Sequence, residues 1–186
     1  RTSNFTTMTD EYIMGLVQNG DLGKSSMLFK RYKLPIYNFF LRITYDSNVS
    51  EDQTQTVFER MIRYRNSYTK SRAFRAWIYQ IARNVKADHY RKNSRMYFSH
   101  IDQEKIALTE MPITEKMEQR EQNKNLEQAL AQLGEEQREV LLLTRFQKLK
   151  YAEVAVLMGC SEGAIKVKVP RAIKELRKFY FIIDAF

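Results

Sequence analysis

Hydrophobic residues along this chain recur at helical spacing almost throughout, and no stretch of useful length alternates as a β-strand would. The pattern therefore predicts an all-α fold. An early helix carries Pro35, which should kink it, and a turn at TYDSN ends it. The next helix is expected to begin at Ser50 as N-cap, with Gln53 at the capping-box position. The apolar positions of the early helix are Leu28, Tyr32, Ile36, Phe40 and Ile43.

The segment FRAWIYQIARNVKADHYRK, residues 74–92, has two distinct faces when its residues are placed about 100° apart. One face is apolar and predicts a core contact: Phe74, Trp77, Ile78, Ile81 and Val85. The other combines cations with tyrosines: Arg75, Tyr79, Arg83, Lys86 and Tyr90. Guanidinium groups neutralise phosphates and tyrosine rings stack on bases, so this stripe suits a separated nucleic-acid strand. A solvated face whose tyrosines cover the edge of the core is the alternative.

The helical pattern is lost over residues 93–122, which contain Pro112 and scattered charges and are predicted to be a linker. It would join a first domain, residues 1–92, to a second, residues 123–186. The net charges of the three parts are +8, −2 and +3 in chain order. Two basic blocks separated by an acidic stretch are typical of two units that bind one polyanion. Ordinary solubilising charge would give the same balance.

The second domain contains the pattern of a helix-turn-helix. Helical spacing returns at Leu126, Gly134 interrupts it, and a helix over residues 135–146 follows. In YAEVAVLMGCSEGAIKVKVPRAIKELRK, Gly159 stands where a left-handed C-cap is needed and Ser161 where the next helix needs an N-cap. A short helix, a tight turn and a long basic helix predict a helix-turn-helix (winged-helix-like) domain, with an ordinary helical hairpin as the alternative.

The outward side of this long helix is predicted to contact duplex DNA. Lysine and arginine on such a helix reach guanine edges or phosphates in the major groove. A proline within the helix removes a hydrogen bond at a cost of about 3 kcal/mol or more, so Pro170 predicts either a bend or an altered site. The candidate duplex-contacting residues are Ser161, Lys166, Val167, Pro170, Arg171 and Lys174.

Other chemistries find little support in the composition. Cys160, His89 and His100 are too few and too scattered for a disulfide or a zinc site, and no cofactor is expected. No apolar run approaches the roughly 18 residues of a membrane span, and the first ten residues lack the core of a signal peptide. We therefore expect a cytoplasmic protein without membrane insertion. Asp52 and Glu59 lack the neighbours of a nuclease metal site, so an enzyme is not expected.

Four segments resemble, in order and spacing, the extracytoplasmic-function (ECF) sigma factors of bacterial RNA polymerase. These are SEDQTQTVFERM, FRAWIYQIARN, LGEEQREVLLL and YAEVAVLMGCSEGAIKVKVPRAIKEL. The resemblance runs from about Asp10 to Lys178. It implies a transcription initiation factor that binds core RNA polymerase and directs it to promoter DNA. The first domain would melt and read the minus-ten element, and the second would read the minus-thirty-five element as duplex.

The resemblance also implies roles for individual residues. Asp52 and Gln55 match positions that face the polymerase clamp helices. Lys166 and Arg171 match the usual major-groove contacts, and the linker would thread the polymerase cleft. Many family members are held by an anti-sigma factor, which makes such an inhibitor a further candidate partner. The loop SYTKSR and the helix after it match the part that captures flipped bases, through Ser71, Phe74, Arg75, Tyr79, Arg83 and Asn84.

Several positions depart from the family pattern. Gln53 and Thr54 stand where aliphatic residues are usual, and Thr56 where an acidic residue is common, so the clamp contacts are expected to differ. Gly134 replaces a frequent proline, and Pro170 replaces a residue that often contacts the DNA backbone.

The apolar terminal segment FYFIIDAF, residues 179–186, is predicted to pack into the core of the second domain; an exposed site for a partner is the alternative. A stand-alone helix-turn-helix regulator is the alternative function. It would explain residues 151–178 but leave the aromatic and cationic stripe and the linker without a role.

Overall fold

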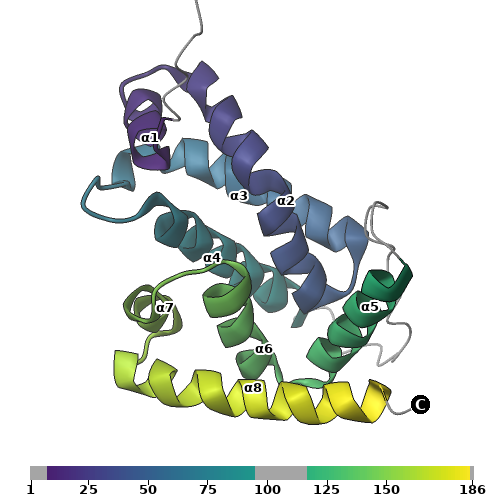
Figure 1. The fold of residues 1–186 in the computed structure, drawn as a ribbon. Coiled ribbons are helices and arrows are strands. Elements are labelled where there is room, and N and C mark those ends of the chain that lie inside the picture. The colour runs from purple at the N-terminus through teal and green to yellow at the C-terminus, as the bar shows by residue number, and fades with distance from the viewer. Residues whose placement is uncertain (1–7, 95–116, 185–186) are drawn as a thin grey trace, which may run out of the picture. The chain divides into compact units, whose positions relative to one another are not determined.

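The structure, a computed structural model, describes residues 8–94 and 117–184 (Figure 1). Every regular element in these two ranges is helical, which confirms the predicted all-α fold. The chain divides into two compact units: unit 1 is residues 1–38 and 48–104, and unit 2 is residues 39–47 and 105–186. The domain boundaries expected from the sequence stay a prediction. None of the described helices is long and apolar enough to cross a membrane.

The first half of the chain forms four α-helices and two short 3₁₀ turns. In chain order they are α1 (Asp10–Gln18), η1 (Leu22–Lys24), α2 (Ser25–Thr44), α3 (Ser47–Arg63), η2 (Arg65–Ser67) and α4 (Phe74–Ser94). Thr9 caps α1, because its hydroxyl oxygen accepts a hydrogen bond from the Tyr12 backbone N–H at 3.2 Å. Helix α2 continues through Pro35.

The apolar face predicted for α4 is confirmed, since all five of its residues are at most 7% exposed. Aromatic rings meet at its first turn. The ring centroid of Phe74 lies 5.2 Å from that of Tyr32, and that of Trp77 lies 5.2 Å from that of Tyr68. Such edge-to-face and tilted pairs stabilise a core beyond the area they bury. Trp77 is therefore a core anchor of unit 1, as its position in the pattern indicated.

The predicted start of α3 at Ser50 is wrong. The helix already begins at Ser47, and Ser50 is fully buried one turn inside it, where its carbonyl accepts the Thr54 hydroxyl at 2.7 Å. Residues 47–49 contain no glycine or proline, so nothing in them prevents the helix from starting earlier. Gln53 does not close a capping box. It is 4% exposed and lies in the interior.

The second half of the chain packs its helices along one long helix. Its elements are α5 (Met117–Gln132), α6 (Glu135–Leu141), the π-helical turn η3 (Leu142–Phe146), α7 (Tyr151–Met158) and α8 (Glu162–Asp184). Helices α5, α6 and α7 all contact α8 (Figure 1). Helix α5 begins inside the predicted linker, and residues 95–116 of that linker lie outside the described residues.

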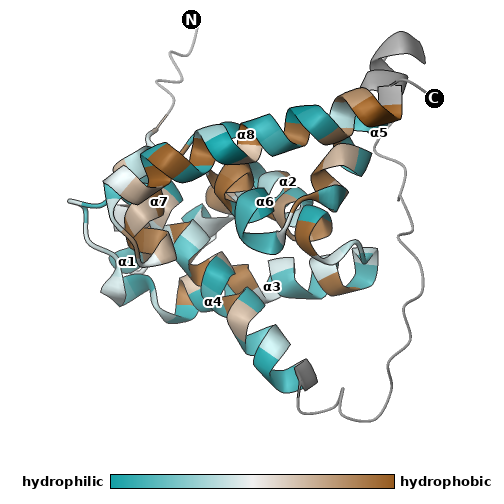
Figure 2. Cartoon of the chain, turned by 90° about the horizontal axis from the view of Figure 1, so that it is seen from below, coloured by the Kyte–Doolittle hydropathy of each residue, from teal (hydrophilic) through white to brown (hydrophobic). Residues whose placement is uncertain are grey.

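The predicted helix-turn-helix is confirmed in α7 and α8. Helix α7 ends at Gly159, whose φ of 65° is the left-handed conformation expected of the cap. The Ser161 hydroxyl accepts the backbone N–H of Ala164 at 3.1 Å and so caps α8. Hydrophobic and hydrophilic residues alternate along α8 (Figure 2), and its buried positions include Ile165 and Val169. The helix runs without interruption through Pro170.

The junction between α5 and α6 lies at Gly134, which has no side chain to cap the second helix. Carbonyl groups at the end of α5 lack partners within the helix, and the Arg138 side chain supplies hydrogen-bond donors to them. Its guanidinium donates to the carbonyl oxygens of Leu130, Ala131 and Leu133 at 2.8–2.9 Å. A single side chain thus ties the two helices together where the frequent family proline is absent.

The prediction that the terminal segment packs into the core is wrong for Phe181 and Ile182. Phe181 is 67% exposed and Ile182 is 50% exposed, while Phe179 and Tyr180 are partly exposed. Residues 185 and 186 lie outside the described residues. The buried positions of α8, Ile165, Val169 and Ala172, all lie in its first half, whereas Phe181 and Ile182 lie in its last turns.

Candidate nucleic-acid interface

The surface proposed for duplex DNA is the outer face of α8 with the turn before it. Lys166, Val167, Pro170, Arg171 and Lys174 follow one another at intervals of one or three residues, so they form one band along the helix. Ser161 is at the N-terminal end of this band. Every predicted duplex-contacting residue is exposed: Ser161, Lys166, Val167, Pro170, Arg171 and Lys174.

Two cations at the start of α8 have acidic partners. The ammonium of Lys166 lies 2.9 Å from the carboxylate of Glu162, one turn earlier. Lys168 donates a hydrogen bond to Glu136 of α6, and this bond raises the pKa of the Lys168 ammonium. Lys168 therefore binds a residue of another helix of unit 2, whereas Glu162, which pairs with Lys166, lies on the same exposed helix face.

The stripe predicted on α4 is not a continuous exposed surface. Tyr79 is fully buried and Lys86 is 8% exposed, so the prediction of an outward stripe is wrong at both positions. Phe74 is also fully buried, in contact with Tyr32, Tyr68 and Trp77. Helical spacing finds the most apolar face of α4, but it does not show that a second side is covered as well.

Four of the predicted minus-ten residues remain accessible. Ser71, Arg75 and Asn84 are exposed, and Arg83 is partly exposed. The Asn84 side-chain oxygen accepts the Gln80 amide at 3.2 Å. The base-contacting roles of Phe74 and Tyr79 stay predictions, and they require a base to approach from a side that is covered in this structure.

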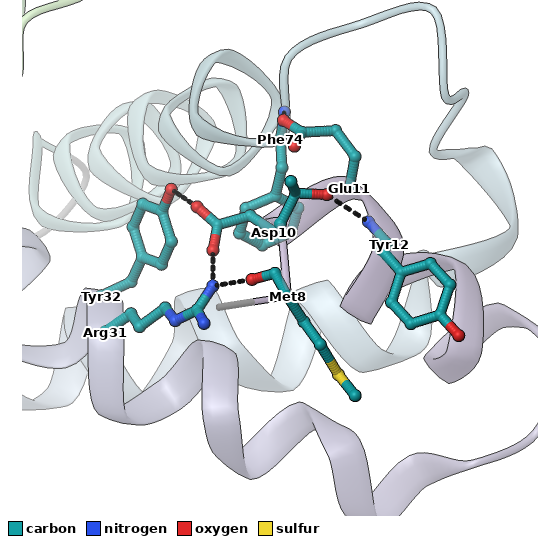
Figure 3. Close-up of polar contacts among 8 residues, drawn as sticks. Met8, Asp10, Glu11, Tyr12, Arg31, Tyr32 and Phe74 are labelled. Carbon is teal, nitrogen blue, oxygen red and sulfur yellow. Dashed lines mark hydrogen bonds and ion pairs between the residues drawn. The ribbon is translucent and has the colours of Figure 1, made fainter. Parts of the chain in front are cut away.

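Arg75, at the start of α4, is held by a polar network that reaches α1 and α2, of which Figure 3 shows the part formed by Asp10, Arg31 and Tyr32. It hydrogen-bonds to the Tyr32 hydroxyl, and this bond raises the Arg75 pKa. Tyr32 in turn donates to Asp10, which also accepts Nη1 of Arg31 at 2.5 Å. Burial, reinforced by the Asp10 hydrogen bond, raises the pKa of Tyr32, so the hydroxyl stays protonated and can donate. The network therefore fixes the position of the exposed Arg75 side chain.

The loop before α4 is a tight turn that ends in the core. The backbone N–H of Arg72 donates to the Thr69 carbonyl at 3.0 Å, and Ser71 lies exposed within this turn. The Tyr68 hydroxyl donates to the Arg72 carbonyl at 2.8 Å. Burial, with the nearby negative charge of Glu11, raises the pKa of Tyr68 to about 12. Tyr68 is therefore a neutral donor at any physiological pH, and its bond to the Arg72 carbonyl closes the loop.

The surface proposed for the polymerase lies on α3. Asp52 and Gln55 are both exposed, and the Gln55 amide donates to Glu59 at 3.1 Å. Gln53 and Thr54, where the chain departs from the family pattern, are buried. The expectation that the departures at Gln53, Thr54 and Thr56 change the clamp contacts stays a prediction, and the first two would act from the interior.

Two residues of α1 that the sequence did not single out hold the loop in place. The side-chain amide of Gln18 donates to the carbonyls of Arg65 at 2.9 Å and Tyr68 at 2.7 Å. A carboxylate oxygen of Glu11 accepts the Phe74 backbone N–H at 3.0 Å (Figure 3). These partners are 47 to 63 residues apart in sequence, so no local pattern reveals them. Across the described ranges, no cluster of His, Cys, Asp and Glu side chains could hold a metal ion.

Comparison with known families identifies both halves of the chain. The model of Sigma-70 region 2 matches residues 28–96, and that of Sigma-70, region 4 matches residues 123–176. The ECF RNA polymerase sigma factor SigC of Mycobacterium tuberculosis is 30% identical over 177 residues, covering 90% of each chain. This chain belongs to the ECF sigma factors. It is thus a factor for transcription initiation, from a family whose members are not enzymes.

Other relatives agree along most of the chain. The RNA polymerase sigma factor YlaC of Bacillus subtilis is 28% identical over 153 residues, which are 81% of this chain and 88% of that protein. The structure of the sigma factor RpoE in complex with the anti-sigma factor NepR, from Bartonella quintana, matches with a TM-score of 0.71 and 22% identity. The match covers 83% of this chain and 94% of that one. A structure of CnrH in complex with the cytosolic domain of CnrY has a TM-score of 0.68 and 19% identity over 95% and 97% of the two chains. The likeness to these two structures shows the fold.

Proposed function

We propose that this sigma factor binds core RNA polymerase in the bacterial cytoplasm and directs it to promoters through two DNA surfaces. Unit 1 reads the minus-ten element as a melted strand, and α8 reads the minus-thirty-five element as duplex. The observation that carries the proposal is the division of α8 into two sides. Ile165 and Val169 are fully buried, while Lys166, Arg171 and Lys174 are exposed along the opposite side of a helix-turn-helix.

The exposed side of α8 has the chemistry of a major-groove reader. Lysine and arginine hydrogen-bond to guanine edges or neutralise phosphates, and an exposed aliphatic side chain such as Val167 contacts the thymine methyl group. The Glu162–Lys166 pair does not prevent this, because an exposed ion pair is worth only about 0.2–1 kcal/mol. A phosphate or a guanine can therefore displace the carboxylate from Lys166.

The accessible residues around the start of α4 support strand capture. Arg75 and Arg83 bring positive charge to the helix, and Ser71 and Asn84 offer hydrogen-bonding groups on the exposed side. An unpaired base displays its edge to such groups, whereas a duplex hides it. Phe74 and Tyr79 are fully buried and would receive a base only after a side-chain rearrangement.

Asp52 and Gln55 on α3 are the proposed contacts with core polymerase, together with the exposed carboxylates beside them. An anti-sigma factor is a further proposed partner, because the matching RpoE structure contains one bound to that sigma factor.

The proposal is tested by mixing the purified chain with bacterial core polymerase and analysing the mixture on a sizing column. We expect the two to co-elute, and we expect Asp52→Ala combined with Gln55→Ala to weaken the complex. A Gln132→Ala variant, which changes an exposed residue of α5, serves as the control. Free protein beside free core at micromolar concentrations would contradict the proposal and favour a stand-alone helix-turn-helix regulator. That regulator would bind duplex DNA equally well with or without core polymerase.

A further inference from the structure

The loop between α3 and α4 is anchored at both ends by α1, a helix that lies outside the residues matched by the region 2 family model. At the first end, the Gln18 amide donates to two carbonyl oxygens, those of Arg65 and Tyr68, at 2.9 and 2.7 Å. At the second end, Glu11 accepts the N–H of Phe74, the first residue of α4. All three bonds are partly buried and join segments distant in sequence.

Between these two anchors only residues 69–73 lie free of α1's hydrogen bonds. Their own bonds keep them compact: Arg72 N–H donates to the Thr69 carbonyl, and the buried Tyr68 hydroxyl donates to the Arg72 carbonyl. Lys70 lies over α1, where a methyl group added at Gly15 would come within 3.1 Å of the lysine Cε atom. Ser71 is left exposed in the turn. The loop is therefore short, and it is held by its own hydrogen bonds and by its anchors on α1.

We propose that α1 is a positioning element for strand capture, and that Gln18 and Glu11 hold the loop of residues 69–73 in the conformation that selects an unpaired base. This inference rests on the proposed function of unit 1. A loop that is already ordered loses less conformational freedom on binding, and its hydrogen-bonding groups keep one geometry for one base. Gln18 and Glu11 do not themselves touch DNA in this proposal. They act through the backbone of the loop.

The test uses the complete chain bound to core polymerase and a fork DNA. The single-stranded non-template segment of this DNA is randomised over about six nucleotides, which is within the usual site size for single strands. Sequencing the bound fraction gives the preference for the best over the worst base at each unpaired position. Gln18→Met removes both donors while keeping the length of the side chain. The loss of two hydrogen bonds is expected to lower the strongest preference about tenfold. Co-elution with core polymerase and binding to fully duplex DNA should be unchanged.

A matched pair at Glu11 separates positioning from general damage to the fold. Glu11→Gln keeps an oxygen that accepts the Phe74 N–H, and its base preference should stay within about twofold of the starting protein, whereas Glu11→Met should lose several-fold of the preference. Gln132→Met on α5 makes the same substitution as Gln18→Met at an exposed site and should change nothing.

The outcomes are distinct. If the unsubstituted protein shows no base preference at any unpaired position, the proposed function of unit 1 fails. If it shows one, and Gln18→Met and Glu11→Met keep that preference, the inference about α1 is overturned. A proportional loss of binding to every sequence, with the preference ratio intact, also overturns it, because a purely structural role has that effect. Should Gln18→Met fail to fold, the comparison of Glu11→Met with Glu11→Gln still decides.

Discussion

Gln53 is a polar side chain in the interior of unit 1, and replacing it with methionine should stabilise the protein. It is 4% exposed, and neither its amide nitrogen nor its amide oxygen has a hydrogen-bond partner among the described residues. Each buried polar group left unpaired costs about 1–3 kcal/mol relative to an apolar group of the same shape. Methionine has nearly the length of glutamine and a similar helix propensity, so backbone and packing should change little.

The expected gain in the free energy of unfolding is about 2 kcal/mol, taking the lower part of that range for each of the two atoms. For a chain of this size, that corresponds to a rise in Tm of roughly 4–8 °C. The assay is chemical denaturation followed by tryptophan fluorescence. Trp77 is the only tryptophan in the chain and lies in the core of unit 1, so the signal reports that unit alone.

Two controls make the result interpretable. Gln55→Met makes the same substitution two residues away on the exposed face of α3 and should change stability by less than about 0.5 kcal/mol. Gln53→Glu puts a carboxylate in the same interior position and should destabilise the protein. If Gln53→Met leaves the unfolding midpoint unchanged or lowers it, the reasoning is refuted, because the amide must then have a partner that stabilises it.

Four further outcomes are expected. Arg60 donates a hydrogen bond of 2.7 Å to Asp88 and so lowers the pKa of that carboxyl in the folded state. The pair therefore stabilises the folded protein above about pH 4, the pKa of an unfolded aspartate, and this stabilisation is lost as the pH falls through the lowered pKa of the folded state. Since the pair is partly exposed and screened by solvent, Asp88→Asn should cost at most about 1 kcal/mol at pH 7 and flatten the acid limb of a stability–pH curve. Pro170→Ala restores a backbone donor within α8 and should stabilise unit 2 by up to about 3 kcal/mol in thermal unfolding; no gain would mean that the helix has already adapted to the proline. Lys166→Ala should reduce the salt slope of duplex binding by about one, and an unchanged slope with lost sequence preference would make it a base reader instead. Arg83→Ala should impair open-complex formation, measured by permanganate footprinting, more than duplex binding; equal losses would argue against a role on the melted strand.

Local patterns were reliable wherever one structural element explains them. The apolar face of α4 is buried as its spacing predicts, and the turn at Gly159 and Ser161 has the left-handed cap and the serine cap that those residue types favour. Each of these features depends on residues within a few positions of one another. The backbone conformation of glycine and the reach of a serine hydroxyl are properties of the residue itself, so they can be predicted without knowledge of the rest of the fold.

Predictions failed where a second element decides the environment. Tyr79 belongs to a polar stripe by spacing, yet it is fully buried, since α4 is covered on more than its apolar side. Ser50 has the chemistry of an N-cap, but α3 starts at Ser47 and carries Ser50 into the interior. The terminal aromatic residues look like core, yet Phe181 extends past the packed part of α8.

The order of hydrophobic and polar residues was enough to predict an all-helical fold with a helix-turn-helix, because periodicity and capping are local properties of the chain. The ECF sigma factor family came from the resemblance of four segments, which is also a property of the sequence alone. The tertiary structure alone revealed that Gln18 and Glu11 hold the loop before α4, and that the buried Gln53 amide has no hydrogen-bond partner within residues 8–94 and 117–184. Contacts between residues 47 to 63 positions apart depend on how helices pack, and packing is decided by the whole set of side chains that share a core. No single segment carries that information.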